Sequence, residues 1–147
     1  MLMTHHFEKL TEEETEFLFK APALVSVLAA NWDHQVSRNA KDEAIKLAHL
    51  KTFTAVPLLQ PYYKEVEKGF KDNFETIVEE YAPFDEEKMD ALRRELVKLN
   101  VVISKLDKEY AQTLLWSLSK FAAQVKKSDR ELLENFIFPF KLPGLTD

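Results

Sequence analysis

The sequence predicts an all-α protein, a compact single-domain bundle of five to seven helices. Apolar residues recur at intervals of three and four in successive segments, which is the spacing of amphipathic helices. Prolines and capping residues separate these segments, and no run of alternating β-branched residues indicates a strand. A chain of 147 residues, 46% of them apolar, is long enough to bury one core. We therefore expect residues 1–147 to form a single helical domain.

A capping box marks the start of the first helical element. Thr11 and Glu14 have the spacing at which each side chain bonds the backbone N–H of the other residue. Pro22 lies inside the apolar run that follows, where it either kinks the helix or occupies the first turn of a second one. We expect a short helix, then a buried helix at about 22–32, and a frayed terminus at residues 1–10.

Five further helices are predicted, each beginning at a capping residue or a proline. Their expected bounds are about 38–53, 62–81, 86–104, 108–126 and 129–138, and their start signals are Ser37, Pro61, Asp85, Asp107 and Ser128. Gly69 lies inside a predicted helix, where glycine is less stable than alanine. We expect that two helices cross closely at this residue. The alternatives are that Gly69 allows a kink or that it has no structural reason. Helix 86–104 carries a near-heptad apolar stripe, which packs inside the monomer or, alternatively, forms a homodimer.

Two features concern the ends of the chain. Ala29-Ala30 before Ser37 and Ala122-Ala123 before Ser128 repeat one pattern of buried helix, turn and capped helix. Two helix pairs related by a pseudo-twofold axis would explain this echo.

Residues 139–147 form a tail too apolar to remain free, and we expect it to dock on the bundle or on a partner.

Composition excludes several classes of function. The chain has no Cys and two Gly, which excludes a disulfide framework, a thiolate zinc site and glycine-rich phosphate loops. Its 20 basic and 25 acidic residues give a net charge of −5, so no nucleic-acid surface is expected. No apolar run approaches the roughly 20 residues that span a bilayer. Without a signal peptide, the expected location is cytoplasmic.

No catalytic constellation is present, so we expect the protein not to be an enzyme. The four His lack the spacing of di-iron or His-Glu-x-x-His zinc sites. His49 shares a polar helix face with Asp42 and Lys46 and is interpreted as a solvated surface residue. Aromatic residues such as Phe53 and Tyr62 are interpreted as core; lining a pocket for an apolar ligand is the alternative.

One stretch resembles a known family. Residues 20–37, KAPALVSVLAANWDHQVS, resemble the first helix and turn of TerB-like tellurite-resistance proteins, whose turn reads Asp-Gly-x-hydrophobic-Ser/Thr with a later acid. Asp33, Val36 and Ser37 match this pattern, whereas His34 replaces the glycine and Ala40 the acid. The similarity lies mainly within residues 11–50. It implies a compact helical fold with a helix-pair repeat, a stress-response role and acidic residues linked to divalent metals.

Three functions therefore remain open. The sequence favours a non-enzymatic helical interaction or stress-response module with a protein partner and no cofactor. One alternative is a divalent-metal site in the 33–43 turn, with Asp33, Asp42 and Glu43 as oxygen ligands. Asp33 also fits a structural role, in which it accepts backbone N–H groups of the turn. The other alternative is a carrier of a small apolar ligand.

Overall fold

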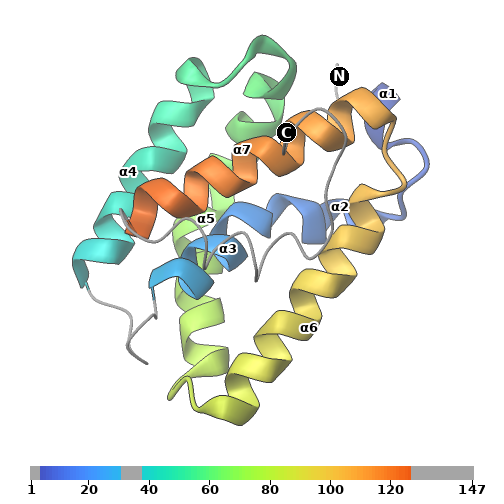
Figure 1. Cartoon of the computed structure of the whole chain (residues 1–147). Helices are drawn as coiled ribbons and strands as arrows, with labels where there is room; N and C mark the ends of the chain where they lie inside the picture. The colour runs from blue at the N-terminus through green and yellow to red at the C-terminus, as the bar shows by residue number, and fades with distance from the viewer. Residues whose placement is uncertain (1–3, 31–37, 127–147) are drawn as a thin grey trace.

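The computed structural model describes residues 4–30 and 38–126 of the chain (Figure 1). These residues form seven α-helices and one 3₁₀ turn: α1 (Thr4–Phe7), α2 (Glu12–Phe19), α3 (Ala21–Ala30), α4 (Arg38–Thr54), η1 (Pro57–Leu59), α5 (Gln60–Tyr81), α6 (Glu86–Ile103) and α7 (Lys108–Lys126). The described ranges contain no strand, so the all-α fold class is confirmed.

Capping explains where the helices begin. At α2, the N–H of Glu14 donates to Thr11 Oγ1 at 3.0 Å, and the N–H of Thr11 donates to Glu14 Oε1 at 2.9 Å. Asp85 accepts from the backbone N–H of Lys88 and thereby caps α6. Pro22 lies in the first turn of α3, so the second of its two predicted roles is correct. The bounds of α4 to α7 agree with the sequence prediction to within two residues.

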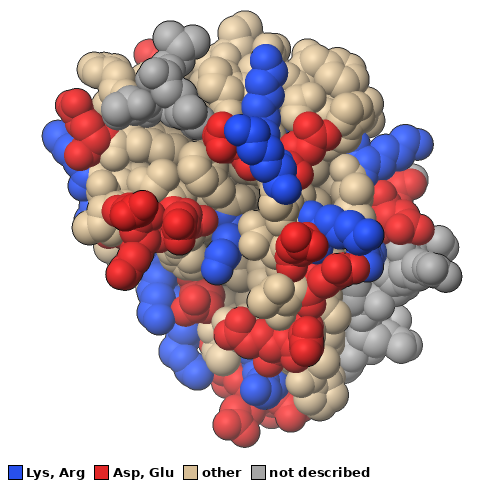
Figure 2. Space-filling model, turned by 180° about the vertical axis from the view of Figure 1, so that it is seen from behind, with Lys and Arg blue, Asp and Glu red and all other residues tan. Residues whose placement is uncertain are grey.

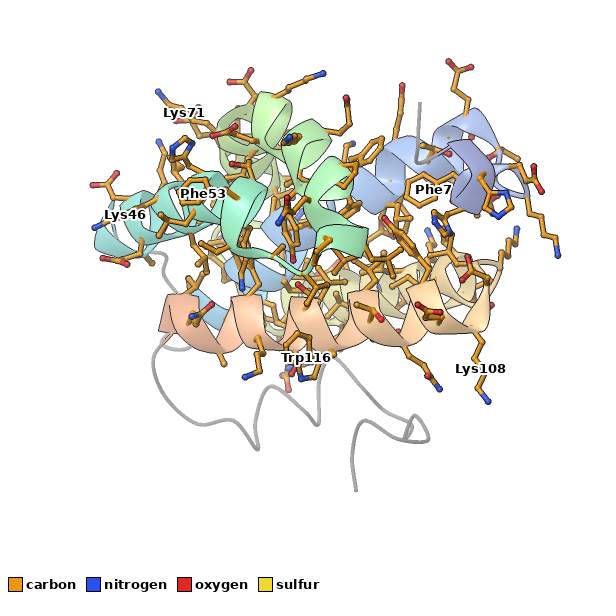
Figure 3. All side chains as sticks on the ribbon, turned by 90° about the horizontal axis from the view of Figure 1, so that it is seen from above. Phe7, Lys46, Phe53, Lys71, Lys108 and Trp116 are labelled. Carbon is orange, nitrogen blue, oxygen red and sulfur yellow. The ribbon has the colours of Figure 1, made fainter. Side chains whose placement is uncertain are left out.

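Helix α3 forms the centre of the bundle. All ten of its residues are buried, and it packs mainly on α7 and α5, with further contacts to α2, α4 and α6. It lies between α7 and α5 in Figures 1 and 3. A helix that is apolar on every side needs such surroundings, because no face of it can be left to water without cost.

Aromatic side chains fill the core around α3. Tyr62 and Tyr63 meet edge to face with ring centroids 5.1 Å apart, and Tyr63 stacks on Phe121 at 6.1 Å. Phe70 and Phe74 are also buried on α5. The interpretation of the aromatic residues as core is therefore confirmed for these side chains.

Three buried tyrosine hydroxyls differ in their hydrogen bonds. Tyr62 donates to the backbone carbonyl of Leu18 at 2.7 Å, and Tyr63 shares a hydrogen bond of 2.6 Å with Ser117. The hydroxyl of Tyr110 is also buried but has no protein hydrogen-bond partner within the described residues. Burial raises the pKa of all three phenols above the usual value.

The prediction of a frayed terminus does not fit residues 4–10. Phe7 is buried, and its ring contacts those of Phe19 and Tyr110. His6 Nδ1 lies 2.8 Å from Asp107 Oδ1, and the His6 ring packs on Tyr110. Phe7 and His6 are thus held by a ring contact with Tyr110 and a hydrogen bond with Asp107, about a hundred residues away, which local sequence cannot reveal.

The predicted helix crossing at Gly69 is wrong. A Cβ atom added there would meet only Asn73 Nδ2, at an ordinary contact distance of 3.5 Å. Among the described residues, no neighbouring helix approaches Gly69 closely, so none of them gives this glycine a packing reason.

The apolar stripe of α6 packs inside the monomer, which is the first of the two alternatives that the sequence offered. Leu92, Leu96, Leu99 and Ile103 are buried, which removes the stripe from a dimer interface. Val97 and Val101 lie off this stripe and are exposed.

Several predictions lie outside the described residues. They are the cap at Ser37, the helix at 129–138 with its cap Ser128, and the docked tail at 139–147. The helix-pair echo uses both turns, so the pseudo-twofold arrangement stays a prediction.

Candidate interaction surface

The structure places two of the three predicted metal ligands. Asp42 and Glu43 lie in the first half of α4 and are exposed, whereas Asp33 lies outside the described residues. Consecutive side chains on a helix diverge by about 100°, so these two carboxylates do not converge on one point. Across residues 4–30 and 38–126, no three His, Asp or Glu side chains form a group that could hold a metal ion. The metal site at the 33–43 turn stays a prediction.

His49 is exposed, as expected, but it is not isolated. Its Nδ1 bonds Glu67 of α5, and its ring meets Phe53 edge to face with centroids 5.8 Å apart. Glu67 has the i,i+4 spacing at which it could pair with Lys71 one turn along the same helix. Glu67 instead links α5 to α4, and a second pair between Lys41 and Glu75 does the same further along.

Helix α4 has an alanine face and an apolar outer face. Ala44, Ala48 and Ala55 are buried, and α4 packs most extensively against α5. Leu50 and Phe53 point away from this face. They are 36% and 59% exposed, and Val56, just after the helix, is 38% exposed. We call Leu50, Phe53 and Val56 the Phe53 surface.

The sequence analysis missed this surface because it assigned Phe53 to the core with the other aromatic residues. A signal was present in the sequence. Ala44, Ala48 and Ala55 recur at helical spacing and mark a face that can approach its neighbours closely. Leu50 and Phe53 lie on the opposite side of the helix. If the alanine face packs against the bundle, the face with Leu50 and Phe53 is exposed.

Charged side chains of both signs lie around the Phe53 surface, among them Glu67, which bonds the His49 that contacts Phe53. Figure 3 shows Phe53 on α4, with Lys46 of the same helix and Lys71 of α5 toward the same end of the molecule. Both lysines are exposed, and neither joins a salt bridge in the part of the chain that the structure describes. Acidic and basic side chains are interspersed over the back of the molecule (Figure 2).

A polar depression of about 330 Å³ lies between the end of α5 and α6. It is lined by Glu80, Tyr81, Lys88, Arg94, Glu95 and Lys98. Its three cations and two carboxylates nearly cancel, and Lys98 already pairs with Glu95 at 3.0 Å. Burial, together with Glu80 and Glu95, raises the pKa of Tyr81 to about 12, so its hydroxyl remains neutral. This depression does not select a ligand of either charge.

Comparisons with known protein families, curated proteins and solved structures found no match for the chain. The resemblance of residues 20–37 to TerB-like proteins therefore stays a prediction. Among the described helices, none combines the length and the apolar character needed to cross a membrane. The case for a function rests on the surface of the molecule.

Proposed function

We propose that this chain is a non-enzymatic helical interaction module whose protein partner binds the Phe53 surface. The observation that carries the proposal is Phe53 itself, an aromatic side chain that is 59% exposed beside two further apolar residues. Contiguous exposed apolar groups with a polar rim are typical of protein interaction sites. Aromatic residues at the centre of such sites supply a large share of the binding free energy.

The charges around the surface favour one kind of partner. Lys46 and Lys71 are exposed on the two helices at the Phe53 surface, α4 and α5 (Figure 3), so carboxylates beside an apolar anchor on the partner would be attracted to both. Complementary charges of this kind raise the association rate and select the orientation of binding. We therefore propose a partner segment with an apolar side chain flanked by Asp or Glu.

Contacts of α4 with the rest of the bundle support the surface before binding. Ala44 and Ala48 fix α4 against the bundle, and the His49–Glu67 pair ties its outer face to α5. A preformed site loses less conformational entropy on association than a flexible one. The stress-response role implied by the TerB-like resemblance is part of the same proposal, and it is supported by residues 20–37 alone.

A matched pair of variants tests the proposal. Phe53→Ser removes the anchor, and Val97→Ser changes an equally exposed apolar residue on α6, which is 58% exposed. Both substitutions should alter the free energy of unfolding by only about 0.5 kcal/mol, because both sites face solvent. Partners are captured from a cell lysate with full-length protein, and each is then purified and titrated by calorimetry.

We expect a partner that binds the wild type and Val97→Ser alike. Phe53→Ser should weaken it by about 30-fold, the equivalent of losing about 2 kcal/mol of binding free energy. A partner whose affinity is the same for Phe53→Ser, or falls as much with Val97→Ser, would contradict the assignment of this surface.

A further inference from the structure

A second exposed aromatic side chain lies on another face of the molecule. Trp116 of α7 is 41% exposed, and Lys120 Nζ lies 5.0 Å from the centre of its ring. Figure 3 shows Trp116 on the outer side of α7, away from Phe53. This face is therefore separate from the Phe53 surface.

The outer face of α7 is shaped to receive large side chains. Ser119 and Ala123 follow Trp116 along the helix and are only half-buried. Both are small, so between Trp116 and the end of α7 this face presents a shallow strip. Large side chains of one helix pack well against such small residues of another.

The same region carries two cations that have no acidic partner among the described residues. Lys51 of α4 is half-buried, and neither Lys51 nor Lys120 forms a salt bridge among the residues described. Burial, and then the nearby charge of Lys120, lower the pKa of Lys51. A segment that brings carboxylates here would relieve the repulsion between the two ammonium groups.

From these observations we infer that the chain's own C-terminal segment, residues 127–147, packs along the outer face of α7 and covers Trp116. This segment has eight large apolar residues in its last sixteen: Leu132, Leu133, Phe136, Ile137, Phe138, Phe140, Leu142 and Leu145. It also has acids to meet Lys51 and Lys120, among them Glu131 and Glu134. Its apolar residues thus complement the exposed Trp116 face, and Glu131 and Glu134 lie within the predicted helix 129–138, where they can meet the two lysines.

The lengths also agree. Trp116 lies ten residues before Lys126, which is about 15 Å along a helix. The helix predicted at 129–138 has ten residues, so after a two-residue turn it would run back over the same distance of about 15 Å. In that antiparallel arrangement Leu132 lies level with Ala123, and Phe136 with Ser119.

Covalent attachment favours this occupant over the alternatives. A short connection holds the segment near α7 at an effective concentration of about millimolar. A second copy of the chain or a separate protein would need a strong interface to compete at cellular concentrations. Those two occupants are the other outcomes that the experiment distinguishes.

Tryptophan fluorescence of full-length protein provides the first test. The chain has two Trp, so Trp32→Phe leaves Trp116 as the only emitter. In that background we compare Phe136→Ser with the control Asn135→Ser. Phe136→Ser should raise the acrylamide quenching constant of Trp116 about twofold and shift its emission to the red, because a covered aromatic becomes exposed. Asn135→Ser should change neither the quenching constant nor the emission of Trp116. If both variants respond equally, or if neither variant responds, the inference is overturned.

Disulfide trapping provides a second test that does not depend on destabilising the segment. The chain has no Cys, so Ala123→Cys and Leu132→Cys introduce a single pair. A disulfide needs Cα atoms about 4.4–6.8 Å apart. Because docking places positions 123 and 132 level with each other, oxidation should join the two Cys within one chain. A disulfide-linked dimer would assign the face to a second copy instead, and a pair that stays reduced would also contradict docking on α7.

Discussion

Three buried tyrosines offer a controlled measurement of what a hydroxyl contributes to this core. Tyr62, Tyr63 and Tyr110 are all fully buried at 0% exposure, so Tyr→Phe removes the same atom from the same kind of environment in each case. Only the hydrogen bond differs. Tyr62 and Tyr63 bond to Leu18 and Ser117, whereas the Tyr110 hydroxyl has no protein partner among the described residues.

The expected effects therefore have opposite signs. Tyr62→Phe leaves a buried carbonyl without its donor, and Tyr63→Phe leaves the Ser117 hydroxyl without its partner. Each should lower the free energy of unfolding by about 1–2 kcal/mol. Tyr110→Phe removes a hydroxyl whose burial without a hydrogen bond costs about 1–3 kcal/mol, so this variant should be neutral or more stable.

Urea unfolding followed by circular dichroism at neutral pH measures all three variants beside the wild type. The transition midpoint should fall for Tyr62→Phe and Tyr63→Phe and stay or rise for Tyr110→Phe, with unchanged slopes. If Tyr110→Phe is as destabilising as Tyr62→Phe, its hydroxyl has a partner in solution and the reasoning from the protein contacts fails.

Three further predictions concern Gly69, the four tyrosines and the turn at 33–43. Gly69→Ala should raise the free energy of unfolding by up to about 1 kcal/mol in a thermal melt, because the helix gains propensity and the new Cβ meets only ordinary contacts; a loss of stability would restore a packing role. All four tyrosines have a folded-state pKa above the unfolded value of about 10. Their contribution to stability is therefore present below pH 10 and lost above it, and phenolate absorbance at 295 nm should rise together with alkaline unfolding rather than before it. If Asp33, Asp42 and Glu43 bind a divalent cation, adding that cation to metal-stripped protein at 100 times its dissociation constant should raise the free energy of unfolding by about 2.7 kcal/mol. Asp33→Ala should abolish this gain. A thermal-melt screen of Ca²⁺, Mg²⁺, Mn²⁺ and Zn²⁺ in which no cation shifts the melting temperature would leave Asp33 as a turn residue.

Helices α4 to α7 and their limits could be predicted from the sequence, because helix formation depends on neighbours three and four residues apart. Thr11 and Asp85 cap the helices that their spacing predicted, and the α6 stripe around Leu96 is buried as its period indicated. A capping bond or an amphipathic face is a local property, so it can be recognised without knowledge of the fold.

Only the tertiary structure decided which faces met and which remained open. Phe53 and Tyr62 are aromatic residues on neighbouring helices, yet Phe53 is exposed and Tyr62 is buried. Glu67 found its partner, His49, on another helix, and Phe7 was anchored by Tyr110 across the length of the chain. Each outcome depends on how whole helices are oriented against one another. That orientation arises from the sum of many weak packing contacts between distant residues, and no local pattern contains it.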